Sequence, residues 1–304
     1  MTDMPQVSDD YQASGHEGDA PVPGGVLHYR LAGPTDAEQV VILESGWSAS
    51  FPYAVWLEKA LTPHVRVLSY DRAGIGDSRS ITPLTPAGLT QQLTALLANL
   101  GIRKPVVVAG HSYGGLIAAL HAAQAPTMVR AMIQIDPTPE ISHELIDPSF
   151  RILPKLARFM QLCAWLKIDG PIFFHTGKEL PSDIFARIKR NPRWLVHSIS
   201  GSIEEIRLIE NIRPIITASE GAKQCPRLVI SCAPEKLIDS WLQKLLMNED
   251  KAKKQWDAIH QLHQQQASLN TASRWMSLPY NHISLVTNRT SADTIASSIL
   301  DFIR

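Results

Sequence analysis

Residues 106–115 read VVVAGHSYGG and decide the fold of the chain. The first four are apolar and mostly β-branched, as in a buried strand, and residues 116–125 have the apolar pattern of a helix. Between them, Gly110, Ser112 and Gly114 form a G-x-S-x-G pattern. A serine on so sharp a strand-to-helix turn has an exposed hydroxyl, and the turn leaves room only for glycine two positions to either side. The stretch predicts Ser112 as a nucleophile that faces the N-terminal end of a helix.

Short apolar runs alternate with helical patterns on both sides of this stretch. We expect strands at residues 40–43, 65–70, 105–109 and 131–135, and helices at 86–100 and 116–125. The first helix has a start signal in Thr85 and Pro86 and a stop signal in Gly101. Continuous apolar strands separated by helices predict an α/β protein, with a mostly parallel central sheet and helices on both faces.

The alternation stops at residues 139–222, which have helical patterns and no convincing strand, and returns with strands at 227–231 and 273–278 and a helix at 291–304. We therefore expect one sheet-forming core, residues 21–138 and 223–304, with a helical insertion at 139–222. Residues 1–20 contain five acidic residues and no lysine or arginine, and are expected to be a disordered lead-in.

Composition limits the classes of partner. The chain has 304 residues, 44% of them hydrophobic, which is enough for a sizeable core. It has 29 basic and 29 acidic residues, so its formal charge is zero and no overall field favours nucleic acid or anionic lipid. No stretch resembles a secretion signal or a membrane span, and we expect a cytoplasmic protein with neither nucleic acid nor membrane as partner.

Metal and redox motifs are not evident in the sequence. The three cysteines show no C-x-x-C spacing. His260 and His263 are three residues apart on a helical pattern, but no third ligand type lies nearby in the sequence. We therefore expect neither a metal ion nor another cofactor.

The chain resembles the α/β-hydrolase fold enzymes from about residue 25 to its C-terminus. The resemblance rests on the GHSYGG segment and on residues 71–78, DRAGIGDS, which are similar to the D-x-x-G-x-G-x-S loop of that family. It implies the α/β-hydrolase fold, with residues 139–222 as a helical cap. We interpret the 71–78 loop as a turn rather than a catalytic element.

The resemblance also implies an oxyanion hole made of two backbone N–H groups. Residues 43–48, LESGWS, are similar to the family's L-H-G-x loop after an earlier strand, with Ser45 where histidine is common. By position, the donors are the N–H groups of Trp47 and Tyr113. A main-chain donor does not depend on the side chain at position 45, although Trp47 is equally open to a pure packing role.

The base and the acid of a catalytic triad follow from position. His282 is the last histidine and follows the last expected strand, where the family has its catalytic base, whereas His111 is interpreted as structural. Two acids remain open. Asp136 ends the strand that follows the nucleophile helix, and Glu235 follows the next strand. We favour Asp136, because a carboxylate at the carboxyl end of a parallel strand faces the site.

The sequence therefore predicts a serine hydrolase with Ser112, Asp136 and His282 as catalytic residues and no cofactor. We expect an apolar carboxylic ester as substrate, since the insertion is rich in apolar residues and caps exclude water from the site. Lactone, amide and carbon–carbon bond hydrolysis use the same residue types and stay open. So does a different class, a small-molecule binder or receptor with little turnover.

Overall fold

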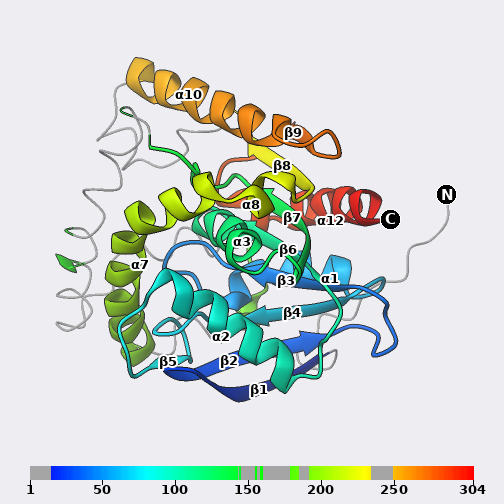
Figure 1. Cartoon of the computed structure of the whole chain (residues 1–304), viewed down its shortest axis with the longest axis vertical. Helices are drawn as coiled ribbons and strands as arrows, with labels where there is room; N and C mark the ends of the chain where they lie inside the picture. Colours follow the sequence, from blue (N-terminus) through cyan, green and yellow to red (C-terminus); the bar gives the residue numbers. More distant parts are fainter. Residues whose placement is uncertain are drawn as a thin grey trace.

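The computed structural model describes residues 15–142, 144, 155, 158–159, 179–184, 192–233 and 249–304. Within these residues the strands form a single nine-stranded sheet (Figure 1). Its strands are β1 (Gly15–Val22), β2 (Gly25–Ala32), β3 (Val40–Glu44), β4 (Arg66–Tyr70), β5 (Arg79–Ser80), β6 (Val106–His111), β7 (Val129–Ile135), β8 (Arg227–Cys232) and β9 (Arg274–Leu278).

The sheet is mostly parallel, as predicted. Its order is β1-β2-β4-β3-β6-β7-β8-β9, with β5 beside β2, and every pair from β4 to β9 is parallel. Only the pairings of β2 with β1, β4 and β5 are antiparallel. The strands β6 and β8 are buried along their whole length, which explains why residues 106–109 and 228–230 within them are continuous apolar runs rather than alternating ones. The α/β fold class is thereby confirmed.

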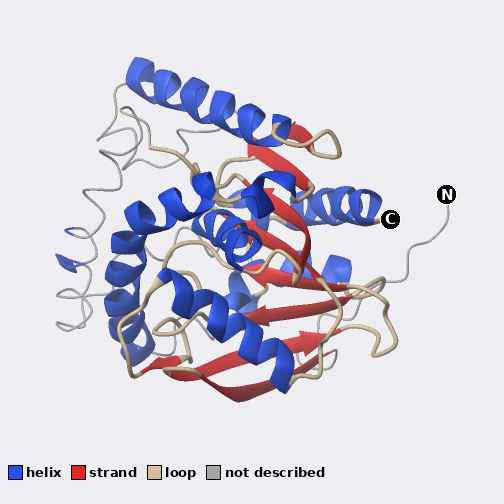
Figure 2. Cartoon of the chain, in the orientation of Figure 1, coloured by secondary structure: helices blue, strands red, loops and turns tan. Residues whose placement is uncertain are grey.

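Helices cover both faces of the sheet (Figure 2). They are α1 (Val55–Leu61), α2 (Pro86–Asn99), α3 (Tyr113–Gln124), α7 (Pro192–Ala218), α8 (Glu220–Gln224), α10 (Glu249–Ser268), α11 (Ser284–Thr287) and α12 (Arg289–Ile303), with the 3₁₀ helix η2 (Phe51–Ala54) before α1. One buried cluster joins the sheet to α2, α3, α7 and α8, and a second joins it to α1, α11 and α12. Helix α3, which follows Ser112, thus lies inside the core, which fixes its first turn.

The ends of α2 follow the signals in the sequence. Thr85 precedes the helix in an extended conformation, and its side chain accepts a hydrogen bond from the Gly88 N–H. Pro86 occupies the first helical position, where its missing N–H costs nothing. Gly101 follows the helix with a φ of 70°, a left-handed conformation in which a side chain is disfavoured.

Residues 1–20 were predicted to be a disordered lead-in. This prediction is wrong for residues 15–20, which belong to β1. Strand β1 pairs antiparallel with β2 along all of its length. Its two acidic side chains lie opposite basic ones in the register, Glu17 beside Arg30 and Asp19 beside His28. The acidic composition that suggested disorder is therefore matched by basic residues on the neighbouring strand. The earlier part of the lead-in, residues 1–14, lies outside the described residues.

Helix α7 is the main described element of the predicted insertion. It is 27 residues long, and no strand occurs among the described residues between 139 and 222. Its second half packs on α3, with Leu208, Ile212 and Ile216 in the buried core cluster. In the described part of the chain, no helix combines the length and the hydropathy that crossing a bilayer requires.

Candidate active site

Ser112 lies on a strained turn between β6 and α3. Its φ and ψ are 55° and −119°, a combination that residues other than glycine rarely adopt. Tertiary hydrogen bonds hold it there: its N–H donates to the Ile135 carbonyl at 2.9 Å, and its carbonyl accepts from the N–H of Thr138 at 2.9 Å. The serine is therefore fixed by the neighbouring strand β7 and the loop that follows it.

The two glycines of the pattern are required by space. A Cβ atom on Gly110 would lie 2.1 Å from the carbonyl oxygen of Gly114. A Cβ atom on Gly114 would lie 2.3 Å from the carbonyl oxygen of Glu44 and 2.6 Å from that of Ser45. These contacts are with backbone, which cannot move aside as a flexible side chain does. Glycine at both positions lets α3 start against β6 and the loop after β3.

Asp136 follows β7 directly and is buried, with a φ of 43°. Its Oδ2 atom lies 2.5 Å from Nδ1 of His282, and its Oδ1 atom accepts the N–H of Cys232 at 3.1 Å. Burial acts to raise the pKa of this carboxyl, but the hydrogen bond and charge of His282 hold the pKa well below its ordinary value. The carboxylate is therefore ionised and ready to orient the imidazole.

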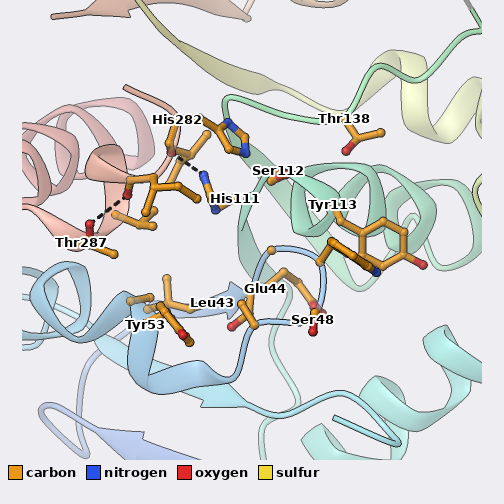
Figure 3. Close-up of a pocket in the computed structure, with 18 of the residues that line it drawn as sticks. Leu43, Glu44, Ser48, Tyr53, His111, Ser112, Tyr113, Thr138, His282 and Thr287 are labelled. Atoms are coloured by element: carbon orange, nitrogen blue, oxygen red, sulfur yellow. Dashed lines mark hydrogen bonds between the residues drawn. The ribbon is translucent and has the colours of Figure 1, made fainter. Parts of the chain in front are cut away.

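His282 lies in the loop between β9 and α11. Its side chain is 36% exposed and lines the same cavity as Ser112 (Figure 3). Because the Asp136 carboxylate accepts the Nδ1 proton, Nε2 is the ring nitrogen that can take up a proton. Asn281 shapes the loop, since its side-chain oxygen accepts hydrogen bonds from the N–H groups of Ile283 and Ser284.

His111, interpreted from the sequence as structural, also lines this cavity. Its Nε2–H donates to the backbone carbonyl of His282 at 2.8 Å, and the two rings lie 4.5 Å apart between centroids. Burial, reinforced by the nearby His282, lowers the pKa of His111 to about 3. It is therefore neutral at physiological pH and holds the loop that carries His282.

The loop after β3 also lines the cavity. Trp47 donates its indole N–H to the carbonyl of Ser202 on α7 at 2.8 Å. Ser48, the next residue, has a φ of 59°, and its N–H donates to Glu205 Oε2 at 3.1 Å. Tyr113 is the first residue of α3 and is also part of the cavity wall. The residues expected to supply the two oxyanion donors thus lie at one cavity.

A buried network of charged groups lies behind this loop. Glu44 interacts with the Tyr70 hydroxyl, with Arg72 Nη1 at 3.2 Å and with His121 Nε2 at 3.2 Å. Arg72 in turn donates its Nε–H to Glu205 Oε1 at 2.6 Å. Sequence reasoning missed these partners. The available signal was the placement of Glu44 at the end of one buried strand and Arg72 just after another, where charged groups face a site.

The cavity at the candidate site measures about 440 Å³. Its wall is mainly apolar, and the aliphatic lining residues are Leu43, Ala49, Ala54, Leu57, Ala109, Ile135, Ile206, Ile209, Ile283 and Val286. Ile206 and Ile209 come from α7, so the predicted insertion contributes to the wall. The charged side chain of Glu44 is directed into the buried network rather than left free. The cavity suits an apolar ligand.

Residues 71–78 form a turn that Asp71 holds together. Asp71 accepts the N–H groups of Asp77 and Phe51, each at 2.9 Å. Ser78 donates its hydroxyl to the Asp71 carbonyl at 2.6 Å. Burial raises the pKa of Asp71 to about 6, against these hydrogen bonds. Gly76 passes so close that a Cβ atom there would lie 1.9 Å from Asp71 Oδ2.

Glu235, the alternative acid, and the histidine pair of α10 were the other candidates from the sequence. Glu235 lies outside the described residues. His263 binds the Ser231 hydroxyl and the Pro137 carbonyl through its two ring nitrogens, and His260 Nε2 donates to the carbonyl of Cys232. Among the described residues, no three histidine, cysteine, aspartate or glutamate side chains form a group that could hold a metal ion. Cofactor-free chemistry stays a prediction.

Known proteins share this arrangement of elements. The sequence model of the Alpha/beta hydrolase family matches residues 40–283. The chain belongs to this family. The match covers the turn that carries Ser112, the loop after β3 and the His282 loop, and it confirms the resemblance drawn from the sequence.

Curated members of the alpha/beta hydrolase family match at low identity. An AB hydrolase superfamily protein of Gibberella zeae is 30% identical over 126 residues, which are 39% of either chain. The match with this relative thus spans about two fifths of its length. A putative carbamate hydrolase RutD of Agrobacterium fabrum is 26% identical over 70% of this chain and 81% of its own.

Solved structures share the fold of this alpha/beta hydrolase. The enol-lactonase of Burkholderia xenovorans superposes with a TM-score of 0.63 and 21% identity, over 94% of this chain and 99% of that one. A thermophilic esterase of Thermogutta terrifontis has a TM-score of 0.60 and 16% identity, over 95% and 98%. At these identities the likeness shows the fold alone.

Proposed function

We propose that this alpha/beta hydrolase is a serine esterase that cleaves apolar carboxylic esters through an acyl-enzyme on Ser112. The observation that carries the proposal is the contact of 2.5 Å between Asp136 and His282 at the cavity that Ser112 lines from its strained turn. A nucleophile, a base and a carboxylate that orients the base are the three parts this chemistry needs.

In the proposed reaction, the Ser112 hydroxyl attacks the ester carbonyl carbon while His282 Nε2 takes its proton. The carbonyl oxygen becomes an oxyanion, which the N–H groups of Trp47 and Tyr113 stabilise. The intermediate collapses, the ester C–O bond breaks and the alkoxide leaves with the proton from His282. Water then attacks the acyl-enzyme with the same base, which releases the acid and restores Ser112.

The choice of an apolar substrate follows from the cavity wall. Its mainly apolar lining supports a ligand with an apolar acyl or alcohol group, because burial of that surface contributes about 25 cal/mol per Å². Relatives are named for different bonds, among them a putative carbamate hydrolase and a lipase LipV of Mycobacterium tuberculosis. Family membership alone therefore does not select the bond.

A panel of p-nitrophenyl esters of increasing acyl length, run beside lactones, an anilide and a carbamate, tests the proposal. We expect multiple turnovers with esters, with kcat/KM rising from acetate toward medium chain lengths. Turnover confined to another bond class would overturn the ester assignment, and tight binding without repeated turnover would instead support a receptor.

The nucleophile is tested separately with an organophosphonate and mass spectrometry. One covalent adduct is expected, on Ser112, together with full loss of turnover. Ser112→Ala should prevent both labelling and turnover. Ser291→Ala is the matched control, since this serine is buried in the first turn of α12 and does not line the cavity. Labelling that persists in Ser112→Ala would overturn the mechanism.

A further inference from the structure

The peptide between Gly46 and Trp47 is bound at its carbonyl end. Arg72 Nη2 donates to the Gly46 carbonyl oxygen at 2.8 Å. This carbonyl and the Trp47 N–H belong to one planar peptide unit, and in a trans peptide they point in opposite directions. A group that fixes the direction of the carbonyl therefore fixes the direction of the Trp47 N–H as well.

Arg72 is well placed to hold this peptide plane. It is buried, and its Nη1 donates to the carbonyl of Ser45 at 2.7 Å, so the guanidinium fork grips two successive carbonyls. The guanidinium carbon of Arg72, Cζ, lies 5.2 Å from the ring centroid of Tyr113. One side chain thus contacts the ring of Tyr113 and the carbonyl of the peptide whose N–H belongs to Trp47.

Glu205 of α7 holds Arg72 in turn. Its Oε1 accepts the Arg72 Nε–H at 2.6 Å, while its Oε2 accepts the Ser48 N–H at 3.1 Å. Both charged side chains are buried, at 2% and 0% exposure. Burial acts to lower the pKa of Arg72, but Glu205 and Glu44 raise it above its ordinary value, so the guanidinium is permanently charged.

We propose that Arg72, held by Glu205, is the positioning residue of the oxyanion hole and acts through the Gly46–Trp47 peptide. Arg72 sets the direction of the Trp47 N–H. Its charged hydrogen bond to the carbonyl also polarises the peptide, which makes the N–H at the other end a stronger donor. The inference rests on the proposed function, because it needs an oxyanion to form beside Trp47.

The test compares Arg72→Met and Arg72→Lys with the wild-type chain on the best p-nitrophenyl ester. Loss of an oxyanion donor typically costs about 10²- to 10³-fold in kcat, and a donor that is present but misdirected should cost less. We expect Arg72→Met to lower kcat by about 10- to 100-fold with KM within about threefold. Arg72→Lys should recover part of this loss, because an ammonium reaches one carbonyl but not two.

Arg30→Met is the matched control. Arg30 is equally buried and binds Glu58 with the same Nε–Oε1 distance of 2.6 Å, but it lies on β2, which does not pair with β3, the strand that leads into the Gly46–Trp47 peptide. This variant should lower the unfolding temperature while kcat, referred to the active-site concentration, stays within about twofold. A merely structural role for Arg72 predicts the same result for both arginine variants.

Binding of an alkylboronic acid gives a second readout. Its tetrahedral adduct on Ser112 carries an oxygen in the oxyanion hole, so its inhibition constant should rise by about the same factor as kcat/KM falls. An unreactive ether of the same shape makes no such adduct and should bind equally to wild type and variant. Glu205→Gln has a single acceptor oxygen, so it can keep the hydrogen bond of Ser48 only by losing that of Arg72, and it removes the charge beside Arg72; it should give an intermediate loss.

Two outcomes would overturn the inference while leaving the proposed function intact. One is a kcat of folded Arg72→Lys and Glu205→Gln within about twofold of wild type, the limit set for the Arg30→Met control, which decides the matter even where Arg72→Met fails to fold. The other is an equal loss of boronate and ether binding. By contrast, turnover that survives in Ser112→Ala would overturn the proposed function itself.

Discussion

Asp136 and His282 are 146 positions apart in the chain, yet their side chains meet with 2.5 Å between Oδ2 and Nδ1. The pKa of Asp136 is lowered mainly by this contact, against the effect of burial, so the carboxylate stays ionised far into the acid range. An amide in its place offers no charge to the imidazolium and favours the wrong tautomer.

Asp136→Asn is therefore expected to lower kcat by about 10²- to 10⁴-fold, as in other hydrolases with this arrangement. Steady-state kinetics on the best ester measures the loss, and a melting curve checks the fold, because Asp136 also accepts the Cys232 N–H. Glu235→Gln should stay within about tenfold of wild type. The reverse ranking in folded proteins would assign the acid to Glu235.

A side chain at Gly114 should disturb the turn that carries Ser112 and so reduce activity. Because a Cβ atom there would lie 2.3 Å and 2.6 Å from two backbone carbonyl oxygens, Gly114→Ala must displace either α3 or the loop after β3. We expect more than about tenfold loss of kcat/KM and a destabilisation of about 1–3 kcal/mol, measured by denaturant unfolding.

Gly101→Ala is the control for backbone strain without a clash. Gly101 has a φ of 70°, and a Cβ atom on it would meet no heavy atom within 4 Å. Its replacement should cost about 1 kcal/mol in stability and leave kcat/KM unchanged. Equal kinetic effects of the two substitutions would show that the close approach at Gly114 has no catalytic consequence.

The unfolding free energy should depend on pH through His28 of β2. Glu17 and, less strongly, Asp19 raise the pKa of His28 to about 9, and Asp19 Oδ1 lies 2.7 Å from its Nδ1. A raised pKa in the folded state means that the stabilisation is complete below the unfolded value of about 6.5 and is lost as pH rises through 9.

His28→Gln should therefore cost about 1–2 kcal/mol at pH 6, after allowance for solvent screening, and progressively less between pH 6.5 and 9.5. Denaturant unfolding at each pH measures the difference from wild type. A constant difference across this range would mean that the strand β1 carboxylates do not stabilise a charged His28.

The parts of the site that were predictable from the sequence are those with local signals. Ser112 stands in a glycine pattern between a strand and a helix, Asp136 ends a strand, and His282 is the last histidine after the last strand. The structure brings these three together at one edge of the sheet because parallel strands end at the same edge. Residues that follow different parallel strands can therefore be predicted to lie close together, even when they are far apart in the chain.

The buried ion pairs were not predictable in this way. Arg72 and Glu205 are 133 residues apart, and no sequence motif contains both of them. Their pairing depends on where α7 packs, which only the tertiary structure specifies. Strand β1 was missed for a similar reason. Acidic residues such as Glu17 and Asp19 do not by themselves indicate a strand, and the basic residues Arg30 and His28 that lie opposite them are known only from the strand pairing.

Strand β1 has a practical consequence for work with shortened versions of the chain. It covers the free side of β2, whose other side pairs with β4 and β5. A version that starts after Val22 would leave β2 as an edge strand with its N–H and C=O groups open to a second chain, and open edges template aggregation. Affinity tags and truncations at this end are therefore best placed before residue 15, and soluble yield should drop sharply once the cut passes into β1.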